Sequence, residues 1–147
     1  MLERITFLLA VLGYIGLTTT AVLAASGRFP RFAWRAAVLI IVLHVGLVWG
    51  GRYQWRLSEA TRNGYVGFLV FHGALALIVT SVFVEERVAR ACAWAAFVIV
   101  TVGALGAVFR YDVVAPYRVP VILVAGVGIA GLTRAFWQKR RRIRTAA

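Results

Sequence analysis

The fold is decided by residues 32–84, which read FAWRAAVLIIVLHVGLVWG (32–50), GRYQWRLSEATRNG (51–64) and YVGFLVFHGALALIVTSVFV (65–84). The two outer segments are almost wholly apolar, and each is close to the ~20 residues that an α-helix needs to cross a ~30 Å hydrocarbon core. The middle segment is polar and carries three arginines, so the outer segments cannot merge into one helix. This stretch therefore predicts two antiparallel transmembrane helices joined by an exposed connection.

Three further apolar runs of similar length, at Ile5–Ala25, Val88–Phe109 and Val119–Trp137, extend the same pattern. The charged residues 85–87 separate the third run from the fourth, and Pro116 and Pro120 break the chain between the fourth and the fifth. We therefore predict an all-α polytopic membrane bundle of five transmembrane helices over residues 1–137, followed by a basic cytoplasmic tail at 138–147. A four-helix alternative would place the fifth run at the membrane surface, and the apolarity of that run argues against it.

Composition supports lipid as the solvent of this chain. It has 147 residues, of which 62% are hydrophobic, and its mean hydropathy is +0.85. A chain this short has too much surface for its volume to hide that excess in one core. The net charge of +12 comes from basic residues at the ends of apolar runs, where they orient a membrane protein and bind lipid headgroups. We therefore expect the bilayer, and not nucleic acid, as the partner of these charges.

The distribution of lysine and arginine predicts the orientation, because cytoplasmic loops carry the excess of these residues. The more basic side would hold the connection after the first run, the turn after the third and the C-terminal tail. Its basic residues are Arg28, Arg31, Arg35, Arg87, Arg90, Arg134, Lys139, Arg140, Arg141, Arg142 and Arg144. This predicts an outside N-terminus and a cytoplasmic C-terminus, in the inner membrane of a bacterial cell.

Two histidines, His44 and His72, are the only ones in the chain, and both fall inside predicted transmembrane helices. Counted from Gly50 and Gly64, they lie about 9 Å and about 12 Å below the same outer surface at 1.5 Å per residue. Polar groups inside the membrane need a partner and point to function. Two neutral imidazoles at one depth on neighbouring helices are the axial ligands that a six-coordinate haem b requires.

The connection between these helices carries Arg52, Arg56 and Arg62, which could pair with the two haem propionates. We therefore list His44 and His72 as candidate haem-iron ligands and the three arginines as candidate cofactor-binding residues. In a general way the hairpin of residues 32–84 resembles small membrane b-type cytochromes. The resemblance covers two residues at a loose spacing, and we transfer no residue role from it.

Alternatives stay open at this point. Each histidine could instead hydrogen-bond a carbonyl, a threonine or a partner subunit, or ligate another metal or a chlorophyll-type pigment. The single cysteine, Cys92, permits no intrachain disulfide and no cysteine-based metal cluster. No set of side chains typical of a stand-alone enzyme stands out in the sequence.

Three functions remain open. The first is a small electron-transfer subunit of a respiratory or photosynthetic assembly, with haem b between the second and third helices and quinone as a candidate partner. The second is a cofactor-free accessory or assembly subunit that packs against other membrane protein subunits. A small transporter is the third and least supported option, because hardly any charge lies inside the helices to hold a substrate.

Overall fold

The computed structural model describes residues 2–62 and 64–146, and the side chains of residues 113, 139, 140 and 142–146 lie outside that description. The described chain is a succession of helices joined by turns and short connections. These elements are α1 (Leu2–Ala25), α2 (Arg31–Gly51), α3 (Leu57–Ala60), α4 (Tyr65–Thr80), α5 (Glu86–Arg110), the 3-10 helix η1 (Asp112–Tyr117) and α6 (Arg118–Ala146).

Four helical segments are long and apolar enough to cross a membrane: α1, α2, α5 and Val114–Gln138, which runs from η1 into α6. The chain therefore has the build of an integral membrane protein, as its composition predicts. The short helix α4 differs from the others. Its 16 residues extend about 24 Å, which is less than the ~30 Å hydrocarbon core. The structure thus supports four of the five predicted membrane helices by length.

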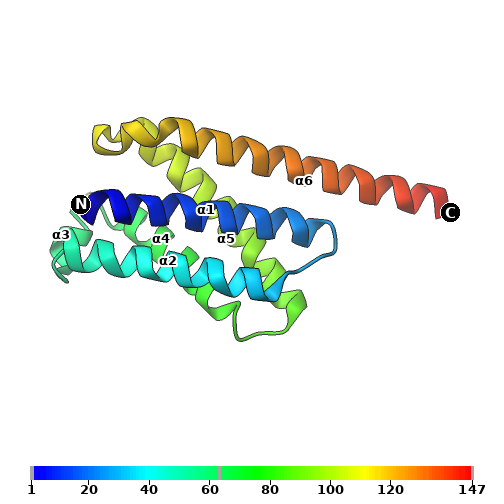
Figure 1. Ribbon diagram of the computed structural model, residues 1–147, viewed down its shortest axis with the longest axis horizontal. Helices are drawn as coiled ribbons and strands as arrows, with labels where there is room; N and C mark the ends of the chain where they lie inside the picture. The colour runs from blue at the N-terminus through cyan, green and yellow to red at the C-terminus, as the bar shows by residue number, and fades with distance from the viewer. Residues whose placement is uncertain (1, 63, 147) are drawn as a thin grey trace.

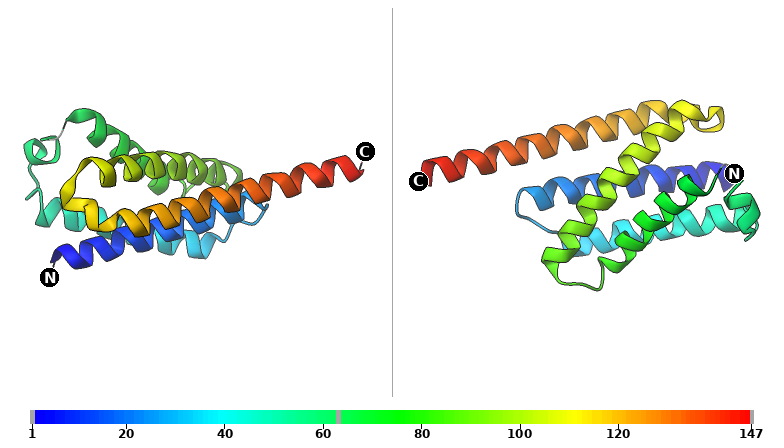
Figure 2. Two further views of the ribbon diagram at one scale, coloured as in Figure 1. Left: turned by 90° about the horizontal axis from the view of Figure 1, so that it is seen from above. Right: turned by 180° about the vertical axis from the view of Figure 1, so that it is seen from behind.

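Helices α1, α2, α4, α5 and α6 run in alternating directions (Figures 1 and 2). The α1–α2 turn, the α4–α5 turn and the end of α6 lie at one end of the bundle, which we call the basic end. The N-terminus, α3 and η1 lie at the opposite end, which we call the α3 end. This arrangement brings the arginines near the two turns and the basic C-terminal residues to the same end, as the alternation of apolar runs predicts.

The turn between α1 and α2 shows how local chemistry ends a helix. Gly27 has a positive φ of 81°, which glycine adopts without a steric penalty. The amide of Gly27 donates to the Ala24 carbonyl, and the amide of Arg28 donates to the Leu23 carbonyl. This pair of bonds is a Schellman motif, which satisfies the last carbonyls of α1. Pro30 then stands immediately before the first residue of α2.

Helices α1 and α2 pack backbone to backbone because α1 carries glycine at the contact. A Cβ built on Gly16 would lie 2.6 Å from the Cβ of Ala37, and one built on Gly13 would lie 2.7 Å from a side-chain carbon of Ile41. Small residues allow such close approach between membrane helices. Glycine in α1 is therefore a packing residue, and the partner of that face is α2.

The core lies where α1 is surrounded by α2, α5 and α6. Leu17 and Trp34 are each 1% exposed, and Phe97 is 3% exposed. Gly128 of α6 makes room for the Phe97 ring, since a Cβ there would lie 2.7 Å from it. Within the core, the Tyr14 hydroxyl donates to Thr101 at 2.8 Å and the Trp34 indole donates to Ser81 at 2.8 Å. These two bonds connect α1 to α5 and α2 to the α4–α5 turn.

One predicted boundary was wrong. The third apolar run continues to Val84, but α4 ends at Thr80 and the amides of Val82 and Phe83 form turn bonds to Val79 and Thr80. The apolar span ends at Gln138, and the helix α6 continues through the basic residues to Ala146. The predicted break between the fourth and fifth runs is confirmed, and η1 occupies it with Pro116 inside.

Candidate functional site

His44 lies on α2 and bonds across to α1. Its Nδ1 atom is 2.7 Å from the backbone oxygen of Thr6, and the side chain is half-buried. A carbonyl oxygen has two lone pairs, so it can accept this bond in addition to its bond within the helix. Because the partner is an acceptor, the hydrogen is assigned to Nδ1. His44 therefore connects α2 to the N-terminal part of α1 rather than to α4.

His72 lies on α4, and both of its ring nitrogens have partners. Nδ1 donates to the backbone oxygen of Phe68 at 2.8 Å, one helical turn earlier. Nε2 accepts a hydrogen bond from the indole Nε1 of Trp49 at 3.1 Å. An indole nitrogen can only donate, so Nε2 carries no proton and His72 is the neutral Nδ1–H tautomer. This bond joins α4 to α2.

Trp49 is the centre of an aromatic group that we call the Trp49 cluster: Trp49, Tyr53, Trp55, Phe68 and His72. The ring of Trp49 lies 5.9 Å from Tyr53, 6.2 Å from Trp55 and 5.7 Å from His72, measured between centroids. The rings of Phe68 and His72 are stacked at 4.0 Å. Offset and edge-on arrangements of this kind are favourable for aromatic rings. The cluster closes the α3 end of the α2–α4 pair.

A tight turn after α2 builds the outer part of this cluster. Gln54 and Trp55 both have positive φ, 49° and 58°, which is uncommon for residues other than glycine. The amide of Trp55 donates to the Trp49 carbonyl at 3.0 Å, so the chain folds back over the end of α2. The Trp55 ring then covers Gly50, where a Cβ would lie 3.6 Å from the indole.

The three candidate arginines all lie in the connection at the α3 end, and all are exposed. Arg52 follows α2 and its amide donates to the Val48 carbonyl. Arg56 precedes α3, and its amide donates to Tyr53. The side chain of Arg62 is 4.0 Å from Glu59, and both groups are largely exposed, so this ion pair contributes little to stability. Pairing of these arginines with propionates stays a prediction.

The arrangement of the two histidines does not fit the ligation of one haem by both. Axial ligation would need an unprotonated nitrogen of each imidazole to face a common iron between α2 and α4. In this structure His44 bonds toward α1. The only unprotonated nitrogen of His72 accepts the Trp49 indole hydrogen. Haem ligation therefore requires breaking at least the Trp49–His72 bond and turning one or both rings.

Sequence reasoning missed two parts of this site, the Thr6 carbonyl and the indole of Trp49. The sequence alone indicated no role for Trp49 in this site. The relevant signal was the spacing on α2, because residues 44 and 49 are separated by about 140° around a helix at 3.6 residues per turn. If Trp49 faces α4, His44 faces away from it. Among the described residues, no group of three histidine, cysteine or acidic side chains could hold a metal ion.

Comparison with known proteins gives no matching family model, no matching curated protein and no matching solved structure.

Proposed function

We propose that this chain is a cofactor-free accessory subunit of a larger membrane assembly in a bacterial inner membrane. In this proposal α4 is a fifth membrane crossing, the α3 end faces outward and the basic end faces the cytoplasm. The alternation of helix directions supports five crossings, and the charge of the basic end supports the orientation.

The observation that carries the proposal is the use of both imidazoles as links between helices. The His44–Thr6 bond joins α2 to α1, and the Trp49–His72 bond joins α2 to α4. Polar side chains hydrogen-bond across helices in this way in membrane proteins, where they contribute to assembly of the bundle. The need of each histidine for a partner is met within the chain, so no cofactor has to be invoked to explain their presence.

The peripheral helix α4 offers the face through which such a subunit would dock. Leu69, Gly73, Ala76 and Thr80 lie along one exposed side of it. A Cβ built on Gly73 would meet no atom within 4 Å, so this glycine is not required by packing inside the chain. Small residues let a second helix approach closely. A helix shorter than the bilayer core is also accommodated by association with other helices.

Two substitutions test this docking face. Gly73→Leu should block a close helix contact on α4 without disturbing the fold. Gly126→Leu on α6 is the matched control, because a Cβ there also meets no atom within 4 Å. The tagged chain is purified from its native membrane in mild detergent. We expect a stoichiometric protein partner with the wild type and the control, and its loss with Gly73→Leu. A wild-type chain that purifies alone and monodisperse would refute the proposal.

The alternative is an electron-transfer subunit that holds haem b and exchanges electrons with quinone or a partner protein. Its support is the placement of His44, His72 and the three arginines in the half of the bundle nearest the α3 end. The dithionite-reduced minus oxidised spectrum of the native protein separates the two functions. Sharp α and Soret bands lost in both His44→Ala and His72→Ala would establish the alternative, and a colourless folded protein would exclude it.

A further inference from the structure

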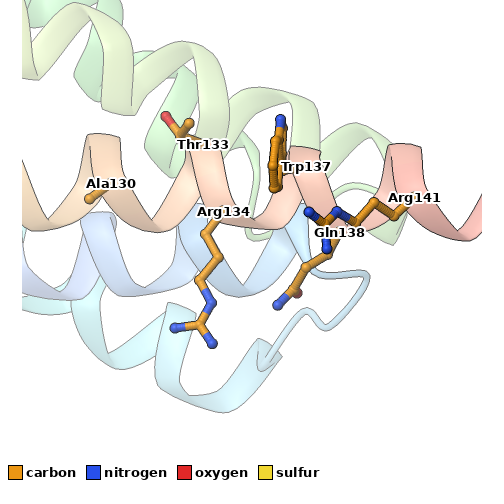
Figure 3. Close-up of a pocket in the computed structure, with 6 residues that line it drawn as sticks. All are labelled: Ala130, Thr133, Arg134, Trp137, Gln138 and Arg141. Carbon is orange, nitrogen blue, oxygen red and sulfur yellow. The ribbon is translucent and has the colours of Figure 1, made fainter.

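The outer face of α6 forms a shallow hollow at the basic end, which we call the α6 trough. It is lined by Ala130, Thr133, Arg134, Trp137, Gln138 and Arg141 and has a volume of about 580 Å³. These residues recur every three or four positions, so they share one side of the helix (Figure 3). Gly128 and Ala135, which are buried against the bundle, lie about 140–160° away around α6. The trough therefore faces away from the protein.

The walls of the trough are held in place by contacts within the chain. The guanidinium of Arg141 lies 4.3 Å from the centroid of the Trp137 ring, a cation–π contact. The neighbouring Phe136 packs edge-on against Trp94 of α5 at 5.0 Å, which fixes the rotation of α6 at this level. The Thr133 hydroxyl donates to the Ile129 carbonyl. Ala130 supplies only a methyl group and forms the floor.

The polar groups of the trough lie at the boundary between apolar and charged sequence. The apolar segment of this helix ends at Gln138, and Trp137 is 62% exposed. Tryptophan and arginine at the end of an apolar span are typical of the lipid headgroup level. Below this level, the outward-facing Val127 is 69% exposed and continues the floor of the trough as an apolar surface.

The charge of this region calls for an anionic partner. Other exposed arginines at the basic end are Arg28, Arg31, Arg35 and Arg87. The two acidic residues there are Glu85 and Glu86, and Glu86 already pairs with Arg90 at 3.3 Å. Within the part of the chain that the structure describes, no carboxylate pairs with Arg134. Arg134 and Arg141 are seven residues apart, or about 10 Å along the axis, with Gln138 between them.

We propose that the α6 trough binds the headgroup of an anionic phospholipid. The phosphate lies between Arg134, Gln138 and Arg141, which offer charged and amide donors, and an acyl chain lies over Ala130 and down along Val127. An acidic protein segment would satisfy the arginines but not the apolar floor, which continues into the membrane. A phospholipid carries both kinds of group in one molecule.

The test uses the full chain in nanodiscs that contain equal amounts of phosphatidylglycerol and phosphatidylcholine. Native mass spectrometry then measures the ratio of the two lipids that stay bound to the released protein. The variant R134Q/R141Q removes both charges, R134K/R141K keeps them, and R28Q/R31Q is the control that removes two exposed charges at the same end. Circular dichroism establishes that each variant keeps the wild-type helix content.

We expect the wild type to retain phosphatidylglycerol in clear excess. Each arginine near an anionic surface favours binding of the anionic lipid by about fivefold. R134Q/R141Q should therefore lower the ratio of retained phosphatidylglycerol to phosphatidylcholine by about 10- to 25-fold. R134K/R141K should keep most of the preference. R28Q/R31Q removes the same amount of charge at the same end but leaves the trough intact, so it should lower the ratio by less than R134Q/R141Q does. Equal retention of both lipids by the wild type, or an equal loss in R28Q/R31Q, would overturn the proposal. Displacement of phosphatidylglycerol by a polyglutamate peptide would assign the trough to an acidic protein partner instead.

Discussion

Replacing Gly16 with alanine tests the close contact between α1 and α2. The new methyl group would lie 2.6 Å from the Cβ of Ala37, whereas carbon atoms in contact prefer about 3.5–4.0 Å. A Cβ cannot rotate away from its backbone, so the two helices must separate by about 1 Å. Overpacking of this kind costs about 1–3 kcal/mol of the free energy of unfolding. The same substitution gains about 0.5–1 kcal/mol because alanine is a better helix former than glycine.

Gly126→Ala provides the comparison that isolates the steric cost. A Cβ at Gly126 meets no atom within 4 Å, so only the gain in helix propensity remains. The difference in unfolding free energy between the two variants should therefore be about 1–3 kcal/mol, with Gly16→Ala the less stable. Unfolding by sodium dodecyl sulfate in mixed micelles, followed by far-UV circular dichroism, measures both. If Gly16→Ala is as stable as Gly126→Ala, the packing of α1 against α2 described above is wrong.

Three further experiments test individual features of the fold. A double-mutant cycle of Trp34→Phe and Ser81→Ala, measured by the same unfolding assay, should give a coupling of about 0.6–1.7 kcal/mol, and a value near zero would refute the buried bond. Nitrogen-15 NMR should find the Nδ1–H tautomer of His72, with a shifted Nε2 resonance in Trp49→Phe; an Nε2–H tautomer would contradict the Trp49 bond. Gly64→Ala should cost about 1–3 kcal/mol, because φ is +105° there, and limited proteolysis should cut the α3–α4 connection faster than in the wild type.

Hydropathy predicted most of the helices well because bilayer thickness sets the length of a membrane span. The run Ile5–Ala25 became α1 (Leu2–Ala25), and the run Val88–Phe109 became α5 (Glu86–Arg110). Pro116 correctly marked the break before α6, since proline cannot donate to a continuing helix. In these places composition and backbone hydrogen bonding lead to the same boundary.

The end of α4 could not be found in the same way. Residues 81–84 continue the apolar run of α4, but their backbone forms a turn instead of a helix. The Ser81 hydroxyl donates to the Ile78 carbonyl and accepts the indole hydrogen of Trp34, 47 residues away. A contact across the fold therefore accompanies the end of this helix, and hydropathy carries no information about it.

For the candidate site, the sequence predicted where the histidines lie but not which way they face. Both are inside helices in the half nearest the α3 end, and the interpretation in which each bonds a carbonyl is what the structure contains. The depth of each histidine in the membrane follows from counting residues. The direction in which its side chain points depends on how its helix is rotated about the helix axis. The rotation of α2 follows from the glycines of α1 and the packing around Trp34, which only the assembled bundle reveals.

The continuous backbone of α6 has a mechanical consequence. Its 29 residues form a rod about 44 Å long, comparable to the ~40–45 Å of a bilayer with its headgroups. At its first residue, Arg118 donates to the Val108 carbonyl at 2.7 Å, which fastens the rod to the end of α5. The opposite end reaches beyond the other helices (Figures 1 and 2). A force on the projecting end would thus act as on a lever whose nearest support is the contact of Phe136 with Trp94 of α5.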